Sequence, residues 1–162
     1  MSGYRARFGL TTPETLAPVN PEFGLRESTL RSIRMADELG FECLMGIDHV
    51  LMPDYWTYMI GKEYHDPFAY LAFVAGMTRR IKLLFGALVV PYRNPFTVAK
   101  SIASLDQLSG GRVILGVAVG YLENEFDAFR LPHRERGAMT DEYIRIMKAL
   151  WTQDETSFTG KY

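Results

Sequence analysis

The sequence has little of what marks specialised protein classes. Its single cysteine, Cys43, has no partner for an internal disulfide, as is usual in a reducing compartment. With 18 Lys and Arg against 19 Asp and Glu, the formal net charge is −1, so no basic field attracts nucleic acid or anionic lipid. The longest apolar runs fall short of the ~20 residues that span a bilayer, and no secretory signal follows Met1. We expect a cytoplasmic protein without nucleic-acid or membrane partners.

Several catalytic signatures are missing as well. The histidines are His49, His65 and His133, and they form neither a His-x-His nor a His-Glu-x-x-His motif, so no metal site is expected. No Gly-x-Ser-x-Gly motif is present, and Cys43 lies inside an apolar run, where cysteines are usually inert. These absences disfavour zinc hydrolases and serine or cysteine hydrolases.

Four short apolar runs divide the chain and predict strands, because each is rich in β-branched and aliphatic residues. They are Arg5–Leu10, Cys43–Ile47, Ile81–Val90 and Val113–Val119. The runs are continuously apolar and do not alternate, which is typical of parallel strands covered on both faces. The sequence therefore predicts a parallel sheet.

Segments with helical spacing lie between and after these runs. Asp66-Pro67 and Asn94-Pro95 are helix start signals, since each places an N-cap residue before a proline at the first helical position. The expected helices cover 26–39, 66–77, the segment from 94 to just before 109, and 136–151. The tail, Ser157–Tyr162, resembles the first arm of a β-hairpin.

The spacing of the predicted strands indicates the fold. Strand centres recur about every 36 residues, so eight such units would need roughly 290 residues, the size of a (β/α)8 barrel. We therefore predict one α/β domain over residues 1–162, a parallel TIM-barrel type half-barrel with about four of the eight βα units. The alternative, a doubly wound dinucleotide-binding sheet, lacks its G-x-G-x-x-G motif after the first strand.

Polar residues at the carboxyl ends of the strands are the candidates for chemistry in such a fold. Asp48 and His49 directly follow the second run; an imidazole there can exchange a proton, and an adjacent carboxylate can fix its tautomer. The alternative is that Asp48 caps a turn and that His49 is a rim residue with its hydrogen bonds satisfied and no catalytic role. Glu123 and Glu125 are interpreted as favourable first-turn charges of a short helix. The long segment Val50–His65 is either a lid or a packed insertion.

Several longer sequence motifs occur in a fixed order along the predicted strands and helices. They are Asp48-His49-Val50, Pro91–Phe96, Leu105–Arg112, Leu115–Gly120, Arg136–Tyr143 and Ala149–Trp151. Together these strings resemble the luciferase-like monooxygenase family over essentially the whole chain, and most closely the branch that uses the 8-hydroxy-5-deazaflavin coenzyme, F420.

The resemblance implies a (β/α)8 barrel that binds FMN or coenzyme F420 at the carboxyl ends of its strands. His49 would serve as the active-site base or proton relay, with Asp48 beside it, orienting the ring and contributing to the cofactor site. Ala87 and Leu88 would form a non-prolyl cis peptide behind the coenzyme ring. Gly120 would also line the cofactor site.

Tyr55 and Trp56, in the long segment Val50–His65, and Tyr121 are the expected substrate and lid residues. The resemblance also bears on the substrate. In sugar-phosphate dehydrogenases of this branch an acid follows the glycine that matches Gly120, and Tyr121 stands there instead, which disfavours that substrate class. The expected function is a flavin- or deazaflavin-dependent oxidoreductase or monooxygenase that transfers a hydride between coenzyme and a small organic substrate.

A second hypothesis follows from length, because the family continues for about another half barrel. The chain would then be a non-catalytic truncated half-barrel that only folds and self-associates. Under either hypothesis this half alone is expected to bind F420 or FMN weakly or not at all, because half of the walls around the ring would be missing. Unpaired edges on the first and fourth strands, and an open inner face with Leu44, Leu84 and Leu88, favour self-association. We expect a homo-oligomer, most simply a dimer.

Overall fold

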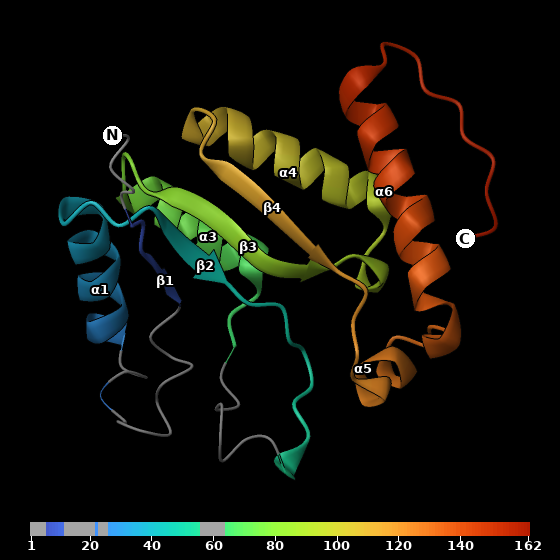
Figure 1. Cartoon of the computed structure of the whole chain (residues 1–162), viewed down its shortest axis with the longest axis horizontal. Coiled ribbons are helices and arrows are strands. Elements are labelled where there is room, and N and C mark those ends of the chain that lie inside the picture. Colours follow the sequence, from blue (N-terminus) through green and yellow to red (C-terminus); the bar gives the residue numbers. More distant parts are fainter. Residues whose placement is uncertain (1–5, 12–21, 23–25, 56–63) are drawn as a thin grey trace.

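Four parallel strands form one sheet, in the order β1-β2-β3-β4, as the sequence predicted (Figure 1). The strands are β1 (Gly9–Thr11), β2 (Cys43–Gly46), β3 (Lys82–Val89) and β4 (Val113–Ala118). The structure is a computed structural model that describes residues 6–11, 22, 26–55 and 64–162. The sheet and its crossover helices have the α/β topology of a partial (β/α)8 barrel, which confirms the predicted fold.

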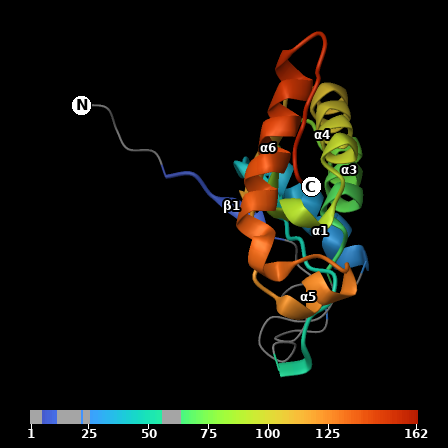
Figure 2. The same cartoon turned by 90° about the vertical axis from the view of Figure 1, so that its right-hand side faces the viewer.

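Helices and short 3-10 turns accompany the sheet. They are α1 (Arg26–Glu38), α3 (Pro67–Met77), η3 (Val90–Tyr92), α4 (Pro95–Ser109), α5 (Glu123–Ala128), η4 (His133–Glu135) and α6 (Arg136–Thr152). Helices α1, α3 and α4 lie on one face of the sheet, and α6 packs against α4 and η3 (Figure 2). No helix in the described ranges is both long enough and apolar enough to cross a membrane.

The helix boundaries agree with the start and stop signals of the sequence. The Asp66 side chain accepts hydrogen bonds of 3.0 Å from the Phe68 and Ala69 N–H groups at the start of α3. Asn94 does the same for Phe96 N at 2.9 Å at the start of α4. Gly110 ends α4 with φ of +76°, in the left-handed region that a glycine adopts without steric cost.

The structure corrects two predicted strand segments. The first strand is shorter and later than Arg5–Leu10, since it covers Gly9–Thr11. The tail Ser157–Tyr162 forms no strand; instead the Lys161 and Tyr162 N–H groups each donate 2.9 Å hydrogen bonds to the Glu142 carboxylate. A side chain of α6 therefore satisfies the backbone donors that a hairpin partner would have satisfied.

The main core lies between the sheet and its helices. Leu44 and Leu88, which were expected on the open inner face, are both 0% exposed in this core, so that expectation was wrong. Leu44 pairs with Leu83 and shares its face, and a register shift between Phe85 and Leu88 returns Leu88 to the helix side. The other face has the row Met45, Leu84 and Ile114, over which the described residues place no helix.

The carboxylate of Asp37 binds the backbone just before β3, at the end of the sheet where the strands begin. Asp37, near the end of α1, accepts hydrogen bonds from the Arg79, Arg80 and Ile81 N–H groups at 3.1, 3.0 and 2.8 Å. Burial would raise the pKa of Asp37, but these three donors and the Arg80 guanidinium hold the pKa below its ordinary value of 3.8. One ionised side chain thus joins α1 to the start of β3.

Asp37→Asn should destabilise the fold. The variant removes the charge and one acceptor oxygen from three backbone donors, so we expect the free energy of unfolding to fall by about 1–3 kcal/mol. Because the folded-state pKa lies below 3.8, this stabilisation is present above that pH and is lost as the pH falls through the folded-state pKa. Urea unfolding at neutral and acidic pH measures both effects. Glu38→Gln is the matched control, and equal stability of the two variants would contradict the assignment.

Candidate functional site

The site lies where the carboxyl ends of β2, β3 and β4 meet (Figure 1). The chain leaves β2 through Asp48 and His49, leaves β3 through η3, and leaves β4 through Gly120 and Tyr121 to reach α5. Parallel strands bring these three exits to the same edge of the sheet, so residues far apart in the sequence come into contact.

Asp48 is buried and bonded on both of its carboxylate oxygens. It is 2% exposed, and Oδ2 accepts hydrogen bonds from Val89 N at 2.9 Å and from Arg93 Nη1 at 2.6 Å. Oδ1 accepts from Arg93 Nη2 at 2.9 Å, so the guanidinium binds the carboxylate in a bidentate manner. These donors correct the expectation that Asp48 orients the imidazole of His49, because its oxygens are turned to β3 and η3.

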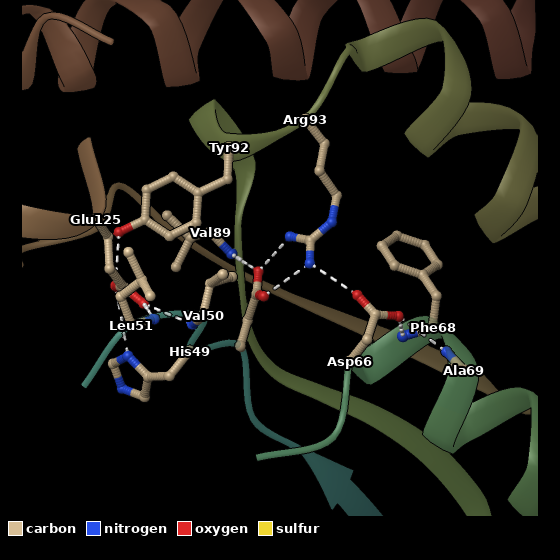
Figure 3. A network of polar contacts seen from close by, with 11 residues as sticks. His49, Val50, Leu51, Asp66, Phe68, Ala69, Val89, Tyr92, Arg93 and Glu125 are labelled. Atoms are coloured by element: carbon tan, nitrogen blue, oxygen red, sulfur yellow. Dashed lines mark hydrogen bonds and ion pairs between the residues drawn. The ribbon is translucent and has the colours of Figure 1, made fainter. Parts of the chain in front are cut away.

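Arg93 extends this network to α3. Its Nη2 also donates to Asp66 Oδ2 at 3.0 Å, while Asp66 Oδ1 caps the helix (Figure 3). The guanidinium carbon lies 5.5 Å from the centre of the Phe68 ring, within the range of a cation–π contact. A single side chain that follows η3 therefore links the exit of β2 to the start of α3.

The carboxylate beside His49 belongs to Glu125 of α5. Glu125 is 1% exposed, and Oε1 accepts hydrogen bonds from Val50 N at 2.6 Å and Leu51 N at 3.1 Å (Figure 3). Oε2 accepts from Tyr92 Oη at 2.8 Å and lies 3.5 Å from His49 Nδ1. At that length the histidine contact is an electrostatic approach without an aligned hydrogen bond.

The partners of Glu125 determine its protonation state. Burial opposes ionisation, but His49, the two backbone donors and the Tyr92 hydroxyl together lower the pKa of Glu125 to about 2. Burial and the adjacent carboxylate raise the pKa of Tyr92 well above its ordinary value of 10.0. Glu125 is therefore an anion and Tyr92 a hydrogen-bond donor at neutral pH.

His49 lies at the rim between two tyrosines. Its side chain is 13% exposed, and its ring centre lies 5.3 Å from that of Tyr64 and 5.8 Å from that of Tyr121, both in edge-on geometry. Tyr121 is 57% exposed and Tyr55 is 67% exposed, so both present aromatic surface at this end of the sheet. Trp56, the third expected lid residue, lies outside the described residues.

Packing explains why two positions at the rim are glycines. The non-prolyl cis peptide joins Gly86 to Ala87, one bond earlier than the Ala87–Leu88 bond that the resemblance implied. Any Cβ on Gly86 would clash with Met45 Sδ, so the irregular step of β3 falls on the glycine. Gly120 has φ of +80°, and a Cβ there would lie 2.8 Å from both Phe126 and Val89. Gly120 is therefore required by the packing of α5.

Sequence reasoning missed three residues of this site: Glu125, Tyr92 and Arg93. Glu125 does lie in the first turn of α5, as interpreted, but that reading missed that its carboxylate is buried and accepts hydrogen bonds from other segments. Tyr92 and Arg93 lie in a string that the sequence analysis singled out without assigning a role. Within the described ranges, no three His, Cys, Asp or Glu side chains gather in a way that could hold a metal ion.

Comparison with known proteins gives consistent results over nearly the whole chain. The family model described as luciferase-like monooxygenase matches residues 7–162. The F420-dependent glucose-6-phosphate dehydrogenase of Amycolatopsis mediterranei is 34% identical over 147 residues, which are 87% of this chain and 42% of that protein. The FMNH2-dependent dimethylsulfone monooxygenase of Pseudomonas putida is 38% identical over 88 residues, 52% of this chain and 24% of that protein.

A solved structure shows the same architecture. The monooxygenase RslO1 of Streptomyces bottropensis has a TM-score of 0.82 and 31% sequence identity, with 97% of this chain and 46% of that chain covered. The chain therefore spans less than half the length of each of these three proteins.

Arg93→Met should destabilise the protein more than an ordinary surface substitution. The side chain of Asp48 is 1% exposed, and without the guanidinium its charge is left buried with one backbone donor. We expect the free energy of unfolding to fall by about 3–5 kcal/mol.

Chemical denaturation measures this loss, and Arg134→Met, at an exposed arginine of η4, is the matched control. Adding Asp48→Asn to Arg93→Met should recover part of the loss, because it removes the unpaired charge. A double variant that loses the full sum of the single effects would argue against the pair.

Proposed function

The chain belongs to the luciferase-like monooxygenase family, and from this premise we propose that it carries the proton-transfer side of a flavin- or deazaflavin-dependent oxidoreductase. The observation that supports the proposal most directly is His49, a mostly buried imidazole beside an ionised carboxylate at the carboxyl end of a partial barrel. A histidine in that position can take up or release a proton near neutral pH. The substrate would be a small organic molecule.

The described rim fits a planar coenzyme ring. Ala87 is a small, half-buried residue next to the irregular step of β3, and Tyr121 and His49 present aromatic edges nearby. We propose that Ala87 backs the ring. Leu88 and Gly120 are buried, so their contribution to the cofactor site would be to support this wall from behind.

The division of work would follow from these positions. When bound, the flavin or deazaflavin supplies the hydride chemistry. His49 would hold or deliver the proton of the substrate, and Tyr64 and Tyr121 would limit the access of water to its ring. Asp48, which has no free acceptor directed to His49, would keep the exit of β2 in place through Arg93.

The relatives differ in coenzyme, since one is F420-dependent and another FMNH2-dependent. Titration of the protein with F420 and with FMN, followed by fluorescence, distinguishes the two, and the proposal requires that at least one of them binds. Tyr121 adds a neutral aromatic surface at the rim, which favours a substrate of low charge over a sugar phosphate.

His49→Asn should slow turnover by the proposed oxidoreductase. Loss of a proton carrier typically lowers kcat by about 10²–10⁴-fold, whereas coenzyme binding should change little. Coenzyme absorbance measures turnover, and fluorescence titration measures binding. His133→Asn, at a histidine outside the rim, is the matched control and should keep kcat. Unchanged turnover of the His49 variant would remove it from the mechanism.

We also propose that a second copy of this chain pairs with the β4 edge of the sheet. Ile114, Val117 and Val119 follow the edge strand β4 and are 41%, 42% and 44% exposed. An edge strand with apolar side chains and unpaired backbone groups favours pairing with another chain.

Light scattering after size exclusion should therefore show a dimer at micromolar concentration. Val117→Lys places a charge on the proposed edge and should shift the protein toward monomer. Leu108→Lys, at an 87% exposed leucine of α4, is the control and should leave the dimer intact. A wild-type monomer would contradict the proposal.

A further inference from the structure

We propose that Glu125 is the positioning residue of His49, and that it fixes the neutral imidazole as the tautomer with its hydrogen on Nδ1. That tautomer leaves the lone pair on Nε2, the ring nitrogen on the side away from Glu125, which is the atom that would accept a substrate proton (Figure 3). The catalytic consequence rests on the proposed function of His49. The tautomer itself is a property of this chain and needs no coenzyme.

Glu125 is held rigidly against the turn that carries His49. Its Oε1 accepts from the N–H groups of Val50 and Leu51, the two residues that follow His49, at 2.6 and 3.1 Å. The neighbouring Asn124 side chain donates to Leu51 O at 2.9 Å. Helix α5 therefore binds the turn after His49 through two backbone donors and one backbone acceptor, which keeps the carboxylate next to the segment that carries the imidazole.

The second oxygen of Glu125 faces the imidazole. Oε2 accepts from Tyr92 Oη at 2.8 Å and lies 3.5 Å from His49 Nδ1. That nitrogen is buried and has no aligned hydrogen-bond partner among the described residues. Because the carboxylate is ionised, it can only accept hydrogen bonds, and a lone pair on Nδ1 would face a negative oxygen. A hydrogen on Nδ1 turns that repulsion into an attraction, and a small rotation of the ring would align the bond.

Asp48 does not compete for this role. Both of its oxygens are occupied by Val89 and Arg93, and its bidentate ion pair directs them away from the imidazole. The two acids of the site therefore have separate tasks, with Asp48 holding the strand exits together and Glu125 setting the state of the ring.

A purely structural role for Glu125 makes a different prediction, which Glu125→Gln tests. In the variant, the Val50 and Leu51 N–H groups require an acceptor, so they should retain the amide oxygen at the Oε1 position. The amide NH2 group then faces His49 Nδ1 and must donate to it. The neutral ring should consequently switch to the tautomer with its hydrogen on Nε2, whereas a structural role leaves the tautomer unchanged.

The experiment is a long-range 1H–15N spectrum of the histidine side chains in the full 162-residue chain, recorded at about pH 8.5, where imidazoles are ordinarily neutral. His49→Asn identifies the His49 signals by their loss. In the wild type, Nδ1 should have the shift of a protonated nitrogen and Nε2 that of an unprotonated one. In Glu125→Gln the two should exchange.

Two matched variants complete the test. Tyr92→Phe removes the other donor to Oε2 but leaves the carboxylate, so the wild-type tautomer should persist. Glu123→Gln removes an exposed acid of the same helix, 3.3 Å from His133 Nδ1, and should leave the His49 signals in place. A wild-type spectrum with the hydrogen on Nε2 would overturn the proposal, even if Glu125→Gln fails to fold.

The same variants distinguish a failure of the proposed function from a failure of the positioning role. If His49→Asn keeps full turnover while the tautomer switches as expected, Glu125 positions a ring that the reaction does not use. If turnover depends on His49 but the tautomer does not change in Glu125→Gln, the proton carrier stands and the positioning role is rejected.

Discussion

The carboxyl end of this sheet is organised by two buried negative charges that must be satisfied. An ionised carboxylate out of contact with water is very costly unless donors surround it. Asp48 obtains them from Val89 and Arg93, and Glu125 obtains them from Val50, Leu51 and Tyr92. Because these donors come from the exits of β2 and β3, satisfying the two charges also fixes where those exits lie. The rim geometry is thus a consequence of charge burial.

The two networks are linked through consecutive residues. Tyr92 reaches Glu125 and Arg93 reaches Asp48, so η3 and the residue after it serve both acids. This short turn follows β3 directly and is itself buried, with Val90, Tyr92 and the intervening proline all shielded from solvent. A displacement of η3 would therefore disturb the partners of both carboxylates at once. The apolar packing of Tyr92 against Phe126 and Phe129 opposes such a displacement.

Sequence reasoning predicted the elements well because their signals are local. The Asp66-Pro67 and Asn94-Pro95 starts act within one helical turn, and continuous apolar runs identify parallel strands. Sequence reasoning failed where the environment of a side chain depends on residues that are far away in the sequence. A continuously apolar strand does not show which alternate residues face the helices, so Leu44 was assigned to the wrong face. Likewise, an acid at the start of a short helix gives no local sign that Tyr92 and His49, far away in the sequence, will surround it. The resemblance of the longer sequence strings pointed to the segment around His49 but gave no indication of its hydrogen bonds.

The distribution of charge at the rim limits the chemistry that it can support. Asp48 and Arg93 neutralise each other, and the Glu125 charge is taken up by donors within the wall. His49 lies beside these paired charges with a side chain that is 13% exposed, so its ring is partly accessible at the rim. Because these charges are paired within the rim, the proposed substrate would bind mainly through shape and aromatic contact, for which the exposed rings of Tyr121 and Tyr55 are available. Because the donors that hold Glu125 come from this chain, the proposed tautomer of His49 is set by the carboxylate behind the ring and requires no ligand.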